Sequence, residues 1–376
     1  MIHPQPVLSL TVHDIAFGGK GVARHEGKVL FVPFTIPGET VTARVVRQKK
    51  NFGEADLLSV EVASPDRVAP ECPYFGRCGG CSYQHIAYPR QLAIKAAQVE
   101  QTLRRVGKLA HVPMRPIVPA PHPFGYRNRI RVHVAGGVTG FFAHDGHQLV
   151  DIEQCAIAAP VVNKALRDLR HAAVGEGDYS LRAKGGGPYF EQTNPDVTRE
   201  LLALVEATAR RGQALLVDAY CGAGIFAKKL AGHFEKVVGI EENVSAIEKA
   251  RRATAPHEHY FHGDVGAHLG EILATHDATR TTVLLDPPAT GLDARVTDLL
   301  LAAAPVEILY VSCNPGTLAR DLAALCRSYE LTAVTPLDMF PQTAEIEVLA
   351  HLEKRALDRS PRSRNRPGGL SRRANR

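Results

Sequence analysis

The chain has 376 residues, of which 45% are hydrophobic and 22% charged, and its formal net charge is +6. This length allows two or three domains with hydrophobic cores, and the absence of an 18-residue apolar span or a signal-peptide pattern in MIHPQPVLSL predicts a soluble, cytoplasmic protein. The mild positive charge suits a nucleic-acid partner but does not establish one.

Short β-rich runs fill residues 1–62 and are separated by glycine and proline. The runs are LSLTV, KVLFVPF, ETVTARVVRQ and ADLLSVEV, and their close spacing predicts a small β-barrel. The turn FGGKGVARHEGK combines glycines with basic side chains that can approach a phosphate chain, although an ordinary loop has the same composition. FGGKGVAR and VPFTIPGETV resemble the TRAM domain, which implies an OB-like, RNA-binding barrel over these residues.

Residues 63–188 form a second predicted domain, of the α+β type. Four apolar residues recur at helical spacing in YPRQLAIKAAQVEQTLRRVGK and predict a packing helix: Leu92, Val99, Leu103 and Val106. The segment YRNRIRVHV alternates apolar residues with Arg127, Arg129, Arg131 and His133, which predicts a strand. Its basic face is either a phosphate-contact surface or a solvated sheet face.

Cysteines are concentrated in the same region. Cys72, Cys78 and Cys81 lie within ECPYFGRCGGCSYQH, and Cys155 in VDIEQC is the expected fourth ligand of a common site. The odd total of seven cysteines argues against the disulfide framework of a secreted protein. Four thiolates suit either a [4Fe–4S] cluster or structural zinc, but the C-x5-C-x2-C spacing is not that of paired zinc knuckles.

From residue 189 to residue 353, strands and helices alternate. The strand-like runs are QALLVDAY, KVVGIEE, EHYFHGDV, TTVLLDPP and VEILYVSC, each followed by a helical segment. Five such units predict an α/β fold with a doubly wound, Rossmann-like, mostly parallel sheet. The remaining residues, 354–376, are rich in Arg, Ser, Pro and Gly and predict a disordered basic tail.

Acids and glycines follow successive strands of this half, where ligands bind doubly wound sheets. Gly222 and Gly224 lie in the first strand-to-helix turn, without the third glycine of a dinucleotide pattern. Asp218 suits an amino-acid ammonium better than a pyrophosphate, Glu241 stands where a ribose-binding acid belongs, and Asp264 can face an adenine amine. The ordered set predicts S-adenosylmethionine binding, against the alternative of a generic doubly wound domain with surface acids.

Cys313 stands at the corner between the strand VEILYVSC and a helix that begins at NPGTL. Asn314 is a good N-cap and Pro315 suits a first helical turn. A thiol beside a helix N-terminus is expected to have a lowered pKa, although a buried packing cysteine is the common alternative.

Carbon methylation fits the motifs near Cys313 better than amine methylation. LLDPP contains Asp286 and has no aromatic residue after its prolines, unlike the Asn-Pro-Pro-aromatic motif of nucleic-acid amine methyltransferases. Methylation of uracil C5 requires a thiolate that adds at C6 and a base that removes the C5 proton. Glu345 and Glu347, at the start of a strand in DMFPQTAEIEVLAHL, are candidate bases, and either can instead be a solvated carboxylate.

The chain up to about residue 352 resembles the RNA 5-methyluridine methyltransferases. The motifs YFEQTN, DAYCGAG, GIEE, LLDPP, YVSCNP and DMFPQTAEIE occur in the order of that family. The resemblance implies that Cys313 is the nucleophile and Glu347 the base, and that the four cysteines hold a [4Fe–4S] cluster. Four further residues match positions that line the cofactor and uracil pocket of the family: Gln192, Tyr220, Glu241 and Asp286. Ile225 and Glu345 depart from the frequent Asn and His of the family.

The implied activity is methyl transfer from S-adenosylmethionine to C5 of one uridine in folded RNA. A TRAM-like barrel with a cluster most resembles members that act on 23S rRNA, while some relatives with this layout modify the T-loop of tRNA. A non-catalytic iron–sulfur RNA-binding protein is an alternative, although it has no chemical reason to keep both Cys313 and Glu347. A cytosine or amine methyltransferase is a third. We expect a monomer with no membrane partner.

Overall fold

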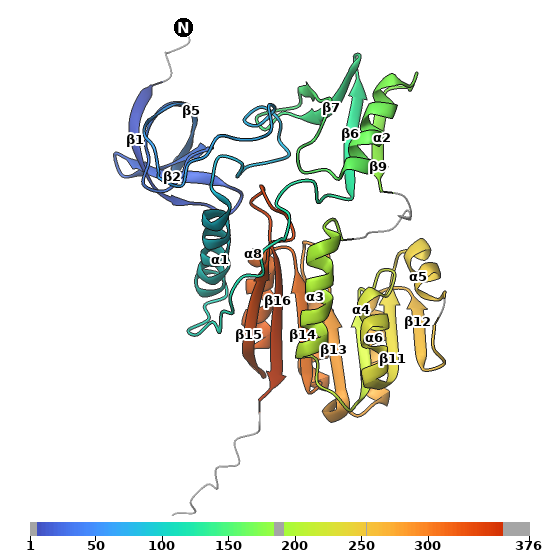
Figure 1. The fold of residues 1–376 in the computed structure, drawn as a ribbon. Coiled ribbons are helices and arrows are strands. Elements are labelled where there is room, and N and C mark those ends of the chain that lie inside the picture. The colour runs from blue at the N-terminus through green and yellow to red at the C-terminus, as the bar shows by residue number, and fades with distance from the viewer. Residues whose placement is uncertain (1–5, 184–191, 253, 356–376) are drawn as a thin grey trace, which may run out of the picture.

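The computed structural model describes residues 6–183, 192–252 and 254–355 (Figure 1). Its strands form a closed barrel, a four-stranded sheet and a seven-stranded sheet. The first three residues of the motif YFEQTN and residues 356–376 of the predicted basic tail lie outside the described residues. None of the helices in the described part is long and apolar enough to cross a membrane.

The N-terminal strands close into a five-stranded barrel in the order β1-β2-β3-β5-β4. They are β1 (Val7–Ile15), β2 (Lys20–His25), β3 (Lys28–Pro33), β4 (Thr40–Gln48) and β5 (Phe52–Val62). Alternate apolar residues such as Leu10, Val32 and Val41 fill the interior, as the period-two pattern requires. The predicted barrel is therefore confirmed.

The second part of the chain is an antiparallel sheet with one covering helix. Its strands have the order β8-β7-β6-β9 and are β6 (Arg129–Ala135), β7 (Val138–Phe142), β8 (Leu149–Asp151) and β9 (Gly177–Arg182). Ile130 and Val132 of β6 pack with Val162 and Leu166 of α2 (Pro160–His171). The predicted strand is confirmed from Arg129 onward, and its apolar face is the one that packs.

Helix α1 (Tyr88–Arg105) differs from its predicted packing face. Val99 and Leu103 are buried as expected, but Val106 is 54% exposed. Three polar side chains share the buried face instead: Gln91, Lys95 and Gln98. An apolar pattern could not predict this face, because the partners of these side chains lie far away along the chain.

The seven-stranded sheet has the order β12-β11-β10-β13-β14-β16-β15. Its strands are β10 (Gln213–Ala219), β11 (Phe234–Glu241), β12 (Glu258–His262), β13 (Thr281–Leu285), β14 (Glu307–Ser312), β15 (Tyr329–Leu337) and β16 (Glu347–Lys354). The first five are parallel, which confirms the five predicted strand–helix units. β16 is antiparallel to both neighbours and includes Lys354, the first residue of the predicted tail.

Helices cover both faces of this sheet (Figure 1). They are α3 (Pro195–Thr208), α4 (Ile225–Leu230), α5 (Val244–Ala250), α6 (Val265–Thr275), α7 (Ala294–Ala303) and α8 (Pro315–Leu325), with short 3₁₀ turns η1 (Ala231–His233) and η2 (Ala278–Arg280). Residues of α1, α6, α7 and α8 form one core, and residues of α3, α4 and α5 form the other. β10 lies between β11 and β13, so the strand order reverses there, which is where ligands bind such sheets.

Candidate active site

Cys313 and Glu347 are brought together by strand pairing. Cys313 follows the last residue of β14, and Glu347 is the first residue of β16, the antiparallel neighbour of β14. The pairing ends at Ser312 and Val348, and one further step of the same register places Cys313 opposite Glu347. A thiol and a carboxyl group therefore share the edge of the sheet at which the parallel strands end.

The surroundings of Cys313 correct one prediction. Helix α8 begins at Pro315, and the Asn314 side chain caps it by accepting amide hydrogen bonds from the first turn, as expected. However, burial and the nearby carboxylates of Glu347 and Asp286 raise the pKa of Cys313 to about 11. The predicted lowering is wrong because desolvation and negative neighbours outweigh the helix N-terminus. The resting group is a thiol, so a proton must leave before the sulfur can attack carbon.

The two candidate glutamates have different environments. Glu347 is 2% exposed, and its Oε1 has no hydrogen-bond partner among the described residues. Burial and the charges of Asp286 and Glu345 raise the pKa of Glu347 well above its usual value. Glu345 is exposed. Of the two glutamates, Glu347 is therefore the one that offers a desolvated carboxyl oxygen on the side of Cys313.

The glycine turn after β10 is fixed by Glu241. Tyr220, Gly222 and Gly224 all have positive φ angles, of 65°, 53° and 78°, which suit glycine and strain tyrosine. The amide of Gly222 donates to Glu241 Oε2 at 3.0 Å, and the amide of Asn243 donates to Oε1 at 2.7 Å. The Glu241 carboxylate thus joins the ends of β10 and β11 at the strand-order reversal.

Three aspartates stand at neighbouring strand ends with different contacts. Asp218 is fully buried beneath the glycine turn and accepts the Ala227 amide at 2.9 Å, and burial raises its pKa to about 8. Asp264 caps α6 and remains half exposed. Asp286 follows β13, where burial and the charge of Glu241 raise its pKa to about 7. The charge of Glu241 thus raises the pKa of Asp286, and the charge of Asp286 in turn raises that of Cys313.

Gln192 lies three residues before the start of α3. It is 7% exposed, its backbone carbonyl accepts Asn128 Nδ2 at 3.0 Å, and its Oε1 has no partner among the described residues. A buried acceptor without a partner is costly unless a ligand supplies the donor. The local sequence contains no signal for this environment, and only the family motif points to Gln192.

Sequence analysis does not point to Lys95 and Asp338, which form a fully buried ion pair at 2.5 Å. Asp338 begins the segment that leads from β15 to Glu347, and Lys95 lies on α1. One sequence pattern could have indicated buried polar residues on α1. The spacing of Gln91, Lys95 and Gln98 places three polar side chains on one face of the helix.

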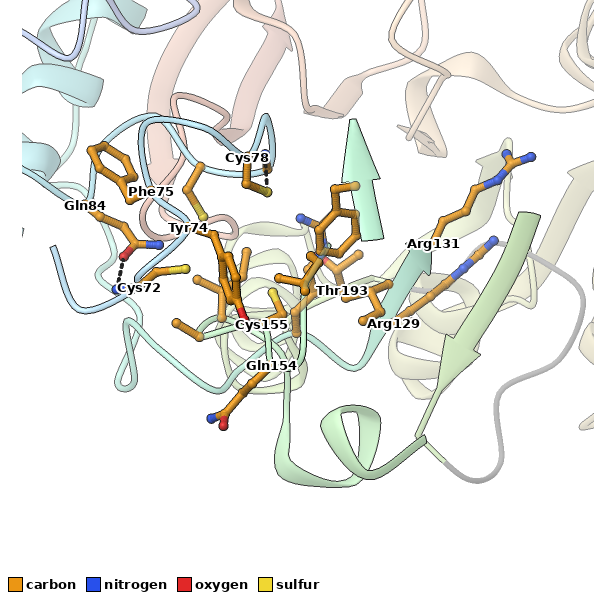
Figure 2. Close-up of a pocket in the computed structure, with 18 residues that line it drawn as sticks. Cys72, Tyr74, Phe75, Cys78, Gln84, Arg129, Arg131, Gln154, Cys155 and Thr193 are labelled. Atoms are coloured by element: carbon orange, nitrogen blue, oxygen red, sulfur yellow. Dashed lines mark hydrogen bonds between the residues drawn. The ribbon is translucent and has the colours of Figure 1, made fainter. Parts of the chain in front are cut away.

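The four predicted cysteines line a single cavity of about 420 Å³, together with Arg127, Arg129 and Arg131 (Figure 2). The amide of Gly80 donates to Cys78 Sγ at 3.4 Å, and the amide of Cys72 donates to Gln84 Oε1 at 3.1 Å. Burial raises the pKa of Cys78 to about 11 and that of Cys81 to about 12. Within residues 6–183, 192–252 and 254–355, no three Cys, His, Asp or Glu side chains lie close enough to share one metal ion.

Two sequence families match this chain. The family described as tRNA (Uracil-5-)-methyltransferase matches residues 269–355, and the TRAM domain matches residues 7–58. The first match covers β16 and both sides of Cys313, and the second covers most of the closed barrel.

Full-length relatives and a solved structure agree with these matches. A protein of Bdellovibrio bacteriovorus named as an uncharacterized RNA methyltransferase is 35% identical over 374 residues, which cover 92% of this chain and 94% of that one. Another, from Thermosynechococcus vestitus, is 31% identical over 439 residues, covering 92% and 97%. The crystal structure of Pyrococcus abyssi tRNA (uracil-54, C5)-methyltransferase with S-adenosyl-L-homocysteine has a TM-score of 0.69 at 23% identity, and the match covers 92% of this chain and 100% of that chain.

Proposed function

From the premise that this chain belongs to the S-adenosylmethionine-dependent RNA (uracil-C5)-methyltransferases, we propose that it methylates one uridine of 23S rRNA through a covalent adduct on Cys313. The observation that carries the mechanism is the placement of Cys313 opposite a buried Glu347 at the strand ends that also hold the glycine turn. RNA is also the ligand class that a TRAM barrel and the arginines near the cysteine cavity suit.

The mechanism uses Cys313 first and Glu347 last. The Cys313 thiol gives its proton to solvent water, and the sulfur forms a bond to uracil C6 while the double bond between C5 and C6 opens, which makes C5 nucleophilic. C5 then attacks the methyl group of S-adenosylmethionine, and the sulfonium–methyl bond breaks to release S-adenosylhomocysteine. Glu347 removes the C5 proton, the double bond between C5 and C6 re-forms, and the C6–sulfur bond breaks. Because burial raises the pKa of Glu347, its carboxylate is a stronger base than a solvated one.

The methyl donor is proposed to bind across the ends of β10 to β13. Glu241 already accepts two amides, but a carboxylate has about four lone-pair sites and can still accept ribose hydroxyl groups. We assign Asp264, which follows the next strand and is half exposed, to the adenine amine. On the family resemblance we assign Tyr220, Gln192 and Asp286 to the side of the donor site toward Cys313, where the sulfonium and the uracil must meet.

We further infer that the four cysteines hold a [4Fe–4S] cluster. Each thiolate of such a cluster binds a different iron, so its ligands stand further apart than those that share one zinc ion. Arg127 supports an anionic occupant, because it lines the cavity and its buried Nε has no partner among the described residues. Because methyl transfer includes no redox step, the cluster would stabilise the surrounding fold or help to bind RNA.

Metal content tests this inference directly. Protein purified without oxygen is expected to contain about four irons and four sulfides per chain, with visible cluster absorbance. Cys81→Ser should lose most of both, while Cys326→Ser, outside the cavity, should match the wild type. Zinc in place of iron, or unchanged iron in Cys81→Ser, would contradict the cluster.

The preference for ribosomal RNA rests on the resemblance of the barrel and cysteine arrangement to enzymes of that substrate class. Transfer RNA is the alternative, favoured by the name of the solved enzyme with a similar fold. In both RNAs, a loop uridine can be flipped out of its stack into a pocket.

Labelled methyl transfer distinguishes the substrates. Ribosomal RNA and tRNA from cells that lack this gene are incubated separately with the protein and labelled S-adenosylmethionine, and the nucleosides are analysed by mass spectrometry. We expect labelled 5-methyluridine in 23S rRNA, and none with the Cys313→Ala variant. Labelled 5-methyluridine in tRNA alone would show that tRNA, and not 23S rRNA, is the substrate. No 5-methyluridine in either RNA would contradict the proposed function.

A further inference from the structure

The residues between β15 and β16, 338–346, carry the chain to Glu347 without helix or strand. We call them the base loop. In Figure 1 the connection lies at the end of β15 and β16 that faces the barrel and the four-stranded sheet. Because no ladder of backbone hydrogen bonds holds the base loop, its position depends on contacts with other parts of the chain.

Gln342 in the base loop is held by both its backbone conformation and its contacts. Its φ angle is 69°, a left-handed conformation that strains a residue with a side chain, and it is 3% exposed. Gln91 on α1 forms a reciprocal pair with it. Gln91 Nε2 donates to Gln342 Oε1 at 3.0 Å, and the Gln342 amide donates to Gln91 Oε1 at 3.2 Å.

The segment after Cys81 contacts the same residue. The amides of Ser82 and Tyr83 donate to the Gln342 carbonyl at 3.1 Å and 3.0 Å. Gln91 Nε2 also donates to the carbonyls of Tyr83 and Ile86, at 3.1 Å and 2.8 Å. The backbone and side chain of Gln342 are therefore both held by residues 82–91, which comprise the segment after Cys81 and the first turn of α1.

A second anchor lies one helical turn along α1. Lys95 Nζ donates to Asp338 Oδ1 at 2.5 Å and to the Phe340 carbonyl at 3.0 Å. Tyr88 donates its hydroxyl proton to the other oxygen of Asp338 at 2.9 Å. Ala344, further along the base loop, packs in an apolar cluster with Ile15 and Ile36 of the barrel part, among others.

We propose that Gln91 is a positioning residue for the methyl-transfer reaction: through Gln342 it fixes the base loop, and so aligns Glu347 with the C5 proton of the adduct. Gln91 touches neither RNA nor methyl donor in this role. The inference rests on the proposed function, because it needs Glu347 as the base. Gln91 is a better probe than Lys95, since removal of Lys95 would leave the charge of Asp338 buried without its cation.

The test compares Gln91→Ala with Gln98→Ala. Both residues are buried glutamines on one face of α1, but Gln98 Nε2 donates to the carbonyls of Ile15 and Ala16 and to the Tyr83 hydroxyl, and within the described part of the chain it makes no hydrogen bond to the base loop. In single-turnover reactions with substrate RNA, Gln91→Ala should form methylated adduct at near the wild-type rate. The covalent adduct on a denaturing gel should then persist at least about tenfold longer, because misalignment slows removal of the C5 proton. Gln98→Ala should keep the wild-type adduct lifetime.

A second variant, at position 342, tests the same inference if Gln91→Ala does not fold. Gln342→Gly adopts the left-handed conformation without strain and removes the side-chain acceptor of Gln91 Nε2, while the backbone amide at position 342 can still donate to Gln91 Oε1. It should also prolong the adduct, and the double variant should be no worse than Gln91→Ala alone, because the two residues act as a pair.

The outcomes separate this inference from the proposed function. Wild-type 5-methyluridine formation with an unchanged adduct lifetime in both Gln91→Ala and Gln342→Gly would overturn the positioning role alone. Equal prolongation in Gln98→Ala would also overturn it, because general loosening of α1 would then explain the effect. No 5-methyluridine from the wild type would overturn both.

Discussion

Cys313→Ala is expected to reduce methyl transfer to RNA by at least about 10⁴-fold, the scale of loss when a nucleophile that acts with a base is removed. Without the sulfur, nothing adds at C6, so C5 stays too weakly nucleophilic to attack the methyl donor. The measurement is the single-turnover rate of labelled methyl incorporation into RNA at saturating enzyme. Donor affinity, measured by calorimetry, should be nearly unchanged, because the glycine turn and Glu241 are intact.

The matched control lies at the other end of the same helix. Cys326 is the C-cap of α8, whereas Cys313 precedes its N-cap, so Cys326→Ala removes a half-buried thiol from the same helix without touching the strand ends. Its rate should stay within about threefold of wild type. RNA containing 5-fluorouridine should trap an adduct on the wild type and on Cys326→Ala, but not on Cys313→Ala. Methyl transfer by Cys313→Ala at a hundredth of the wild-type rate or more would contradict a nucleophilic role.

Much of the catalytic fold is predictable because its parallel strands are buried on both faces. Such strands appear in the sequence as continuous apolar runs that end in an acid or a turn, as QALLVDAY and TTVLLDPP do. The position of β16 between β14 and β15 is not predictable in this way, because strand order depends on contacts between distant segments. Yet that insertion is what places Glu347 opposite Cys313.

The residues of the candidate site also differ in whether the sequence alone can predict them. Motif order alone names Cys313 and Glu347, and the local pattern correctly predicts the helix that begins after Cys313. Burial decides the rest: it separates Glu347 from exposed Glu345, and it raises the pKa of Cys313 where the helix end alone predicts a lower value. The local sequence does not predict the role of Gln91 for the same reason, because its side chain is paired with Gln342, which lies far away along the chain.

Glu347→Gln is expected to reduce multiple-turnover methylation by about 10²- to 10⁴-fold, the usual contribution of a positioned base. The amide keeps the size of the side chain but cannot accept the C5 proton. In the proposed mechanism, addition of Cys313 and methyl transfer both precede that step, so the variant should still methylate RNA once and then remain attached to it. A protein–RNA adduct that carries the labelled methyl group should therefore accumulate on a denaturing gel with unmodified RNA.

Glu345→Gln provides the control, because it makes the same change two residues earlier, on an exposed side chain. It should turn over within about threefold of wild type and leave little adduct. If Glu345→Gln instead trapped the methylated adduct while Glu347→Gln turned over, the base would be Glu345, and burial beside Cys313 would not be what selects it. If neither variant trapped the adduct, a group outside this pair would remove the C5 proton, and the alignment of β14 with β16 would serve only to hold the thiol.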